Sequence, residues 1–124
     1  MNPLNEKKRE EMATEIFEWL VEHELWVDVC IYFNGKRWGT HNIETGEFYY
    51  NQRKYYEAEA DPRDYFEYVR EPENILSMSF EGPLYEILNG YGGHHLAEEF
   101  VKIFEKYGLY IELGNSWNLT ACEG

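Results

Sequence analysis

Apolar residues at intervals of three and four predict an amphipathic helix over residues 5–24. Ala13, Ile16, Phe17 and Leu20 fall on one side of this helix, which we expect to face a core. The opposite side carries a stripe of carboxylates: Glu11, Glu15, Glu18 and Glu22. No Lys or Arg lies within the stripe, so repulsion of about 0.2–0.5 kcal/mol per pair of like charges is not relieved inside the helix.

The pattern then changes to alternation, which predicts an antiparallel hairpin. Residues 25–33 alternate as a strand does, and Asn34-Gly35 supplies the positive φ angles that a type I′ turn requires. A two-residue turn at this point places Ile31 opposite Trp38, in a second strand over residues 36–43.

A second turn, at Thr45-Gly46, predicts a third strand over residues 47–55. If Ile43 faces Phe48 across this turn, Tyr50 falls beside His41. The three strands then lie next to one another in one antiparallel sheet.

The second half of the chain mixes helix and strand signals. Asp61-Pro62 begins a short helix that runs to Arg70, because Asp is a favoured N-cap and Pro is tolerated in the first turn. Residues 75–80 alternate as a strand, and Gly82-Pro83 begins another short helix. The last helix carries its apolar residues at helical spacing and ends at Gly108.

A hairpin closes the chain, and its loop length follows from the apolar pattern. The residues expected to share one face are Leu109, Ile111, Leu113, Trp117, Leu119 and Ala121. We predict a three-residue loop over residues 114–116, because a two-residue loop would set Ile111 against Asn118.

These elements predict a single α+β domain over residues 1–124. Their order is α-β-β-β-α-β-α-α-β-β, with a mainly antiparallel sheet and helices packed on one face. The chain of 124 residues is 44% hydrophobic and 18% aromatic. A chain of this length buries roughly two-thirds of its unfolded surface, so a single hydrophobic core can stabilise the domain.

Two segments carry the whole of the net charge of −13. Residues 10–24 contain only carboxylates among their Asp, Glu, Lys and Arg, and residues 57–86 set many carboxylates against Arg63 and Arg70. A protein that grips phosphates offers Lys and Arg, so we expect no direct binding to nucleic acid and none to an anionic membrane. The charge favours a cationic protein partner.

The apolar runs and the cysteines of the chain indicate its cellular compartment. No apolar run follows the N-terminus as in a signal peptide, and no stretch approaches the ~20 apolar residues of a membrane span. Cys30 and Cys122 are the only cysteines, and without an export signal we expect reduced thiols. We therefore expect a cytoplasmic protein, with no cofactor.

The second acidic segment interleaves carboxylates with tyrosines. Carboxylates pair with guanidinium groups and rings stack on them, so this mixture suits an arginine-rich groove. A peripheral helix with Phe66 and Val69 packed inward is compatible with the same pattern. The predicted partner-binding residues are Glu57, Glu59, Asp61, Asp64, Tyr65, Glu67, Tyr68 and Glu71, together with Glu11, Glu15, Glu18 and Glu22.

One constellation resembles catalytic machinery. The predicted register places Asp28 opposite His41, with Tyr50 and Cys30 nearby, and a carboxylate can orient an imidazole as a general base. An ordinary cross-strand polar pair explains the same residues, and no oxyanion-hole motif accompanies them. We favour that explanation and predict no catalytic residue.

The pairs His94 with Glu98 and His95 with Glu99 have the i, i+4 spacing of some metal ligands. A metal site needs further ligands, to which the sequence does not point. We favour a solvated first helical turn and predict no metal.

In its size, acidity and two acidic segments (residues 10–24 and 57–86), the chain resembles small acidic anti-defence proteins of phages and mobile elements, such as antirestriction and anti-CRISPR inhibitors. The resemblance implies a non-enzymatic inhibitor. Such a protein occupies the basic groove of a nucleic-acid-binding enzyme, with carboxylates where phosphates normally lie. Two alternatives stay open: an immunity protein that neutralises a cationic nuclease toxin, and a small enzyme or ligand-binding domain that uses the Asp28–His41 face.

Overall fold

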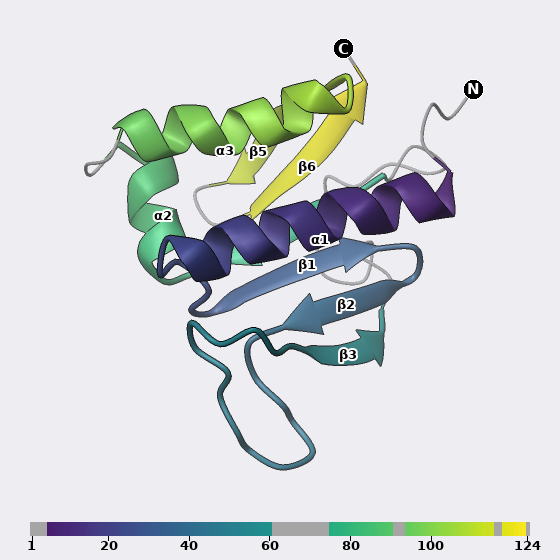
Figure 1. Ribbon diagram of the computed structural model, residues 1–124, viewed down its shortest axis with the longest axis vertical. Helices are drawn as coiled ribbons and strands as arrows, with labels where there is room; N and C mark the ends of the chain where they lie inside the picture. Colours follow the sequence, from purple (N-terminus) through teal and green to yellow (C-terminus); the bar gives the residue numbers. More distant parts are fainter. Residues whose placement is uncertain (1–4, 61–74, 91–93, 116–117, 124) are drawn as a thin grey trace.

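A six-stranded antiparallel sheet with helices on one face forms the molecule, as expected for an α+β domain. The computed structural model describes residues 5–60, 75–90, 94–115 and 118–123. The strand order is β3-β2-β1-β4-β6-β5. Along the chain the elements are α1 (Glu6–Glu22), β1 (Val29–Phe33), β2 (Lys36–Gly39), β3 (Tyr56–Glu59), β4 (Ser77–Phe80), α2 (Pro83–Leu88), α3 (His94–Lys106), β5 (Leu109–Asn115) and β6 (Asn118–Glu123) (Figure 1).

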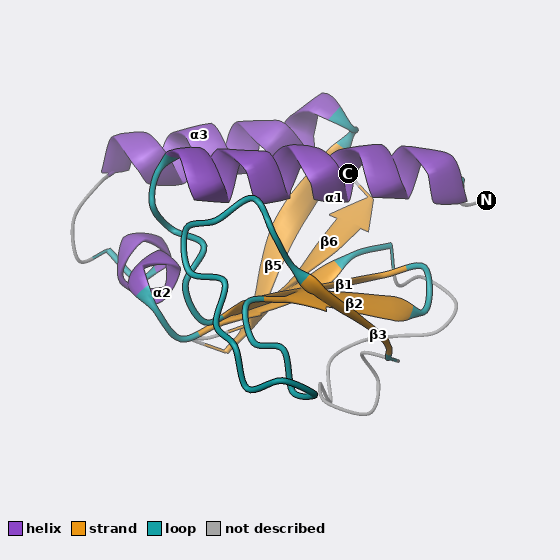
Figure 2. Ribbon diagram, turned by 60° about the horizontal axis from the view of Figure 1, so that its bottom comes forward, coloured by secondary structure: helices purple, strands orange, loops and turns teal. Residues whose placement is uncertain are grey.

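The core lies between the sheet and two long helices. Helices α1 and α3 run side by side over one face of the sheet, and α2 lies near one end of that layer (Figure 2). Alternate strand residues such as Ile31 and Phe80 point into this core, where they join Ile16 of α1 and Phe104 of α3. On the other face, Tyr32 is buried against Cys30 and Ala60. The period-two pattern therefore predicted the core face of the sheet correctly.

Helix α1 confirms the predicted amphipathic helix and ends in a Schellman motif. Asn5 caps its start by accepting a hydrogen bond from the Lys8 backbone N–H (2.9 Å). At its end, the Leu25 N–H donates to the Leu20 carbonyl (2.7 Å) and the Glu24 N–H to the Val21 carbonyl (3.2 Å). Glu24 adopts φ 58°, a conformation that favours glycine.

Strand β1 begins at Val29, later than the predicted residue 25. Glu24 and Asp28 both have positive φ, so the backbone between them does not follow an extended course. Leu25 and Trp26, predicted to face opposite ways, are both buried in the core. The alternating pattern of residues 25–28 therefore comes from a turn that buries both Leu25 and Trp26 in the core, and not from a strand.

The hairpin between β1 and β2 confirms the predicted register. Asn34 (φ 49°) and Gly35 (φ 74°) both have positive φ, as a type I′ turn requires. Ile31 lies opposite Trp38. The turn residues and the alternating apolar pattern therefore specify the same strand register.

The third strand was predicted in the wrong place. Residues 47–55 belong to a long loop between β2 and β3, and β3 starts only at Tyr56. Within the loop, Phe48 pairs with His41 and not with Ile43. Asn42 causes the shift, because its side-chain oxygen accepts the backbone N–H groups of the two residues that open the turn, at 2.9 and 3.2 Å.

The C-terminal hairpin keeps the predicted faces but not the predicted register. Leu113 pairs with Leu119, and an irregularity lies between Leu113 and Asn115. The predicted loop would have paired Leu113 with Trp117, a residue outside the described part of the chain. A shift by two residues leaves every side chain on its face, so the apolar pattern does not detect it.

Two further predictions concern the rest of the chain. The helix predicted from Asp61-Pro62 to Arg70 lies outside the described residues. Helices α2 and α3 confirm the predicted pair after β4. Within the ranges that the structure describes, no helix has both the length and the apolar character to cross a membrane.

Candidate functional site

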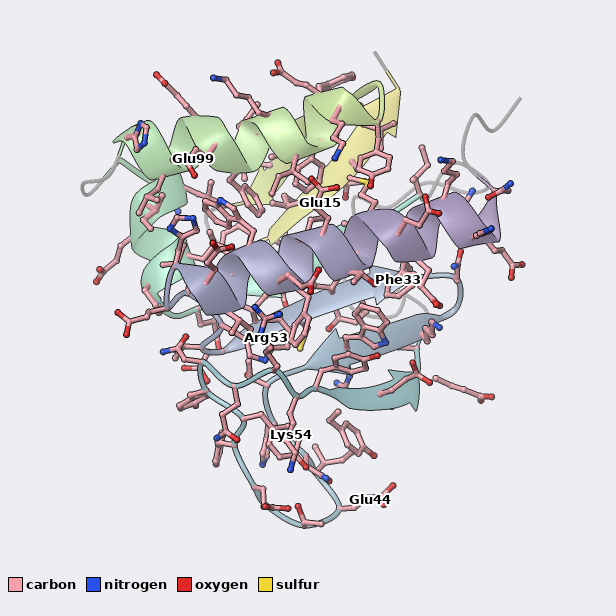
Figure 3. All side chains as sticks on the ribbon, viewed as in Figure 1. Glu15, Phe33, Glu44, Arg53, Lys54 and Glu99 are labelled. Atoms are coloured by element: carbon pink, nitrogen blue, oxygen red, sulfur yellow. The ribbon has the colours of Figure 1, made fainter. Side chains whose placement is uncertain are left out.

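The carboxylate stripe of α1 contacts cations from distant segments. Glu15 accepts hydrogen bonds from Lys106 Nζ (3.1 and 3.2 Å) and from the Tyr107 hydroxyl (3.0 Å). Figure 3 shows Glu15 between α1 and α3. Burial, followed by the bond to Glu15, raises the pKa of Tyr107 to about 12. This carboxylate therefore connects two helices of the fold.

Two neighbours in the stripe are compensated in the same way. Glu18 forms an ion pair with Arg53 (3.2 Å), which Figure 3 shows beside α1. Glu11 pairs with Lys8 (3.3 Å) at the start of the helix. Among the described residues, Glu22 alone of the predicted stripe lacks such a partner. Arg53 and Lys106 from other segments, together with Lys8 of α1 itself, thus relieve the repulsion within the stripe.

Of the predicted partner-binding residues in the second acidic segment, the structure describes Glu57 and Glu59. Glu57 accepts a hydrogen bond from the Trp38 indole (2.8 Å) and lies 3.6 Å from Lys36 Nζ. Glu59 is exposed at the end of β3. The other predicted partner-binding residues, Asp61, Asp64, Tyr65, Glu67, Tyr68 and Glu71, lie outside the described residues.

The structure brings Tyr50 to Asp28 but does not form the predicted pair of Asp28 with His41. Asp28 accepts a hydrogen bond from the Tyr50 hydroxyl (2.6 Å), and His41 stacks on Phe48. In the described part of the chain, no hydrogen bond or ion pair joins Asp28 to His41. Burial raises the pKa of the Cys30 thiol, which disfavours the nucleophilic thiolate. The predicted cross-strand pairing of Asp28 with His41 is therefore wrong.

A shared carboxylate connects the first turn of α3 to the end of α1. Glu99 lies 2.7 Å from His95 Nε2 and 3.6 Å from His23 Nε2, and it accepts the Trp19 indole N–H at 3.2 Å. His95 and Glu99, four residues apart on α3, therefore contact each other, where the sequence had favoured a solvated first turn. Among the residues described, no group of three or more His, Cys, Asp or Glu side chains has the arrangement of a metal site.

The loop between β2 and β3 exposes a row of rings that includes His41 and Tyr50, two residues that the sequence analysis placed near Asp28. The loop extends away from the helices (Figure 1). His41 and Phe48 are stacked, with ring centroids 4.3 Å apart and planes within 5°. Tyr50 continues the row at 5.2 Å from Phe48, and its hydroxyl bonds to Asp28. We call His41, Phe48, Tyr50 and Asp28 the ring platform.

The ring platform is exposed although its backbone is firmly held. Asn51 donates its N–H to the Trp26 carbonyl (2.9 Å) and accepts the Trp26 N–H on its side chain (3.1 Å). The Trp26 indole donates to the Lys54 carbonyl (2.9 Å). Since Trp26 is fully buried, these bonds attach the loop to the core. Phe48 nevertheless remains 49% exposed.

The chemistry around the ring platform is acidic. Glu44 lies at the far end of the loop in Figure 3 and accepts the Tyr56 hydroxyl at 3.0 Å. Asp28 and Glu47 are exposed as well. The hydrogen bond to Asp28 raises the pKa of Tyr50 to about 12, so Tyr50 stays a neutral donor. Residues 40–52 contain no Lys or Arg.

One sequence signal pointed toward this surface. Asn42 and Gly46 are residues that favour turns, and the aromatic run Phe48-Tyr49-Tyr50 begins two residues after Gly46. Because the segment was assigned to a regular strand, the sequence did not reveal a structured loop.

Searches of family models, curated proteins and solved structures with this chain find no match.

Proposed function

We propose that this protein is a non-enzymatic acidic inhibitor that binds a basic, nucleic-acid-binding surface of a partner protein. The proposal accounts for the imbalance of charge, 24 Asp and Glu against 11 Lys and Arg. A partner groove lined by Lys and Arg attracts such a surface over a distance set by the ionic strength.

One observation carries the proposal: carboxylates remain on the surface after the fold has formed its ion pairs. Lys8, Lys36, Arg53 and Lys106 each contact a carboxylate. Exposed carboxylates whose side chains have no hydrogen bond or ion pair in the described part of the chain are Glu6, Glu22, Glu24, Glu59, Glu81, Glu86, Glu98 and Glu105. This remaining charge is available to a cationic partner.

The predicted stripe on α1 supports the proposal less than expected. Exposed ion pairs contribute about 0–1 kcal/mol each, so a strongly basic partner could exchange them for its own. Glu11, Glu15 and Glu18 would first have to leave their present partners. Glu22 and the unpaired carboxylates above need no such exchange.

Affinity capture combined with an activity assay tests the proposal. Immobilised protein is incubated with host lysate at low and at high salt, and captured proteins are identified by mass spectrometry. We expect a nucleic-acid-binding enzyme that elutes as salt rises and whose nucleic-acid binding the purified protein blocks. Capture of the same enzyme without any loss of its nucleic-acid binding would overturn the inhibitor. Capture of a nuclease toxin would identify the immunity-protein variant of the same function.

A further inference from the structure

We infer that the ring platform is the contact surface of the proposed inhibitor, and that it takes an arginine side chain of the cationic partner. This inference rests on the proposed function and adds to it where the partner binds and which residue is recognised. The surface comprises His41, Phe48 and Tyr50, with Asp28 at one end.

The first argument is the exposure of apolar rings on a held backbone. Exposed apolar groups that adjoin one another commonly mark interaction sites. Ile43 (62% exposed) lies in the same loop as Phe48 and Tyr50. The bonds from Trp26 and Asn51 fix the loop before any partner arrives. A partner therefore meets a surface that loses little conformational freedom on binding.

The second argument is charge. Residues 40–52 contribute Glu44 and Glu47 and contain no Lys or Arg, and exposed Asp28 adjoins the row of rings. Of the two cations that follow in the loop, Arg53 pairs with Glu18, and Lys54 Nζ lies 5.4 Å from the centre of the Tyr49 ring. Only a cationic group complements rings that are bordered by carboxylates in this way. The overall charge of −13 disfavours a second copy of this chain and a nucleic acid as occupants.

The third argument selects arginine over lysine. A guanidinium is planar, so it stacks on an aromatic ring while its N–H groups bond a carboxylate beside that ring. The Tyr50 hydroxyl bonds Asp28 Oδ1, and in the described part of the chain Oδ2 has no protein partner. A guanidinium over Phe48 and Tyr50 therefore meets both a ring and a free carboxylate oxygen.

Peptide binding tests the inference, with an oligo-arginine and an oligo-lysine peptide of equal length as probes. Affinities are measured by fluorescence anisotropy at low salt for the wild type, Phe48→Ala and Asp28→Asn. Tyr110→Ala is the matched control, because Tyr110 on the opposite edge strand β5 is 48% exposed, against 49% for Phe48. Circular dichroism verifies that each variant folds.

We expect the wild type to prefer oligo-arginine and Phe48→Ala to weaken that peptide by roughly tenfold, a loss typical of a cation–π contact and of burial together. Asp28→Asn should weaken it as well, and Tyr110→Ala should not. Equal affinities of Phe48→Ala and Tyr110→Ala for oligo-arginine would overturn the inference. So would equal affinities of the wild type for the two peptides.

The same variants separate this inference from the proposed function. If Phe48→Ala still captures and inhibits the enzyme as the wild type does, the ring platform is wrong while the inhibitor stands. If the wild type prefers oligo-arginine but blocks no nucleic-acid-binding enzyme, the arginine site stands and the proposed function fails.

Discussion

Helix α1 and the loop between β2 and β3 both present side chains to solvent, but they differ in what those side chains contact. On α1, Glu15 and Glu18 contact Lys106 and Arg53. On the loop, the rings of the platform contact one another and remain exposed. A surface whose charges already form ion pairs within the fold therefore gains less free energy on binding a partner than exposed apolar rings do.

The energies of the two surfaces explain this difference. A partner that displaces an internal ion pair replaces one interaction in water with another, and such pairs contribute about 0–1 kcal/mol. A partner that covers rings removes apolar area from water, which contributes about 25 cal/mol per Å². Covering Phe48 should therefore contribute more to binding than contacting Glu18.

The largest expected effect distinguishes the anchor of the loop from its surface. Trp26→Ala removes a fully buried indole and its bond to Lys54, so the free energy of unfolding should fall by about 3–5 kcal/mol. Phe48→Ala, the control, should change it by less than about 0.5 kcal/mol, as expected for a surface site. Denaturant titration measures both. A similar loss in the two variants would mean that Phe48 belongs to the core, and the comparison would fail.

Glu24→Gly should stabilise the end of α1. Glu24 holds φ 58°, a region that costs a residue with Cβ about 1–2 kcal/mol, so Gly should raise the free energy of unfolding by about 1 kcal/mol. Glu24→Ala removes the same carboxylate but keeps Cβ, and it should give no comparable gain. Glu24 is one of several exposed carboxylates without a partner among the described residues, so both variants should keep most of the wild-type affinity for the partner. If Glu24→Ala raised the free energy of unfolding as much as Glu24→Gly, the gain would come from removing the charge and not from the backbone conformation.

The pH dependence of stability probes one tyrosine in each region. The pKa of Tyr107 and that of Tyr50 are each raised to about 12, with Glu15 and Asp28 as their respective carboxylate partners. The pKa of tyrosine in the unfolded chain is about 10. Between that pH and about 12 the unfolded state binds fewer protons than the folded state, so stability should fall as pH rises.

Single and double Tyr→Phe variants test this assignment. Tyr107→Phe and Tyr50→Phe should each reduce the alkaline slope of stability, and the double variant should reduce it by about the sum, since distant sites add. Tyr32, whose pKa burial raises to about 12, should maintain part of the slope. Thermal unfolding across this pH range gives the slope. An unchanged slope in Tyr50→Phe would argue against its bond to Asp28.

The smallest effect is expected on α1. Glu18→Gln breaks an exposed pair with Arg53 and should change the free energy of unfolding by less than about 0.5 kcal/mol. Partner affinity should change by less than about twofold, which is the size of a peripheral charge effect. Calorimetry with the captured partner measures the affinity. A loss as large as that of Phe48→Ala would return the contact surface to the stripe on α1.

Local signals predicted much of the fold. Helix α1 and the Asn34-Gly35 hairpin depend on spacing and turn chemistry within a few residues, and both are confirmed. Residues 25–28 were assigned wrongly because a turn that buries Leu25 and Trp26 has the same pattern as a strand. The C-terminal register was missed because a shift by two residues preserves both faces of the sheet.

The candidate site was less predictable than the fold. The pattern identified the carboxylates of α1 but not their partners, since Glu15 and Lys106 lie 91 positions apart. It also identified the aromatic residues of the loop but assigned them to a strand. Exposure of Phe48 depends on whether another segment covers it, and neighbouring residues do not reveal that.

By itself, the sequence determined the acidity of this protein, the α+β class and the core face of β1 and of the C-terminal hairpin. These follow from composition and from short-range periodicity, which a chain carries before it folds. Only the tertiary structure decided which carboxylates are compensated and which rings stay exposed. Both depend on contacts between segments far apart in the chain, such as Glu18 with Arg53 and Trp26 with Lys54.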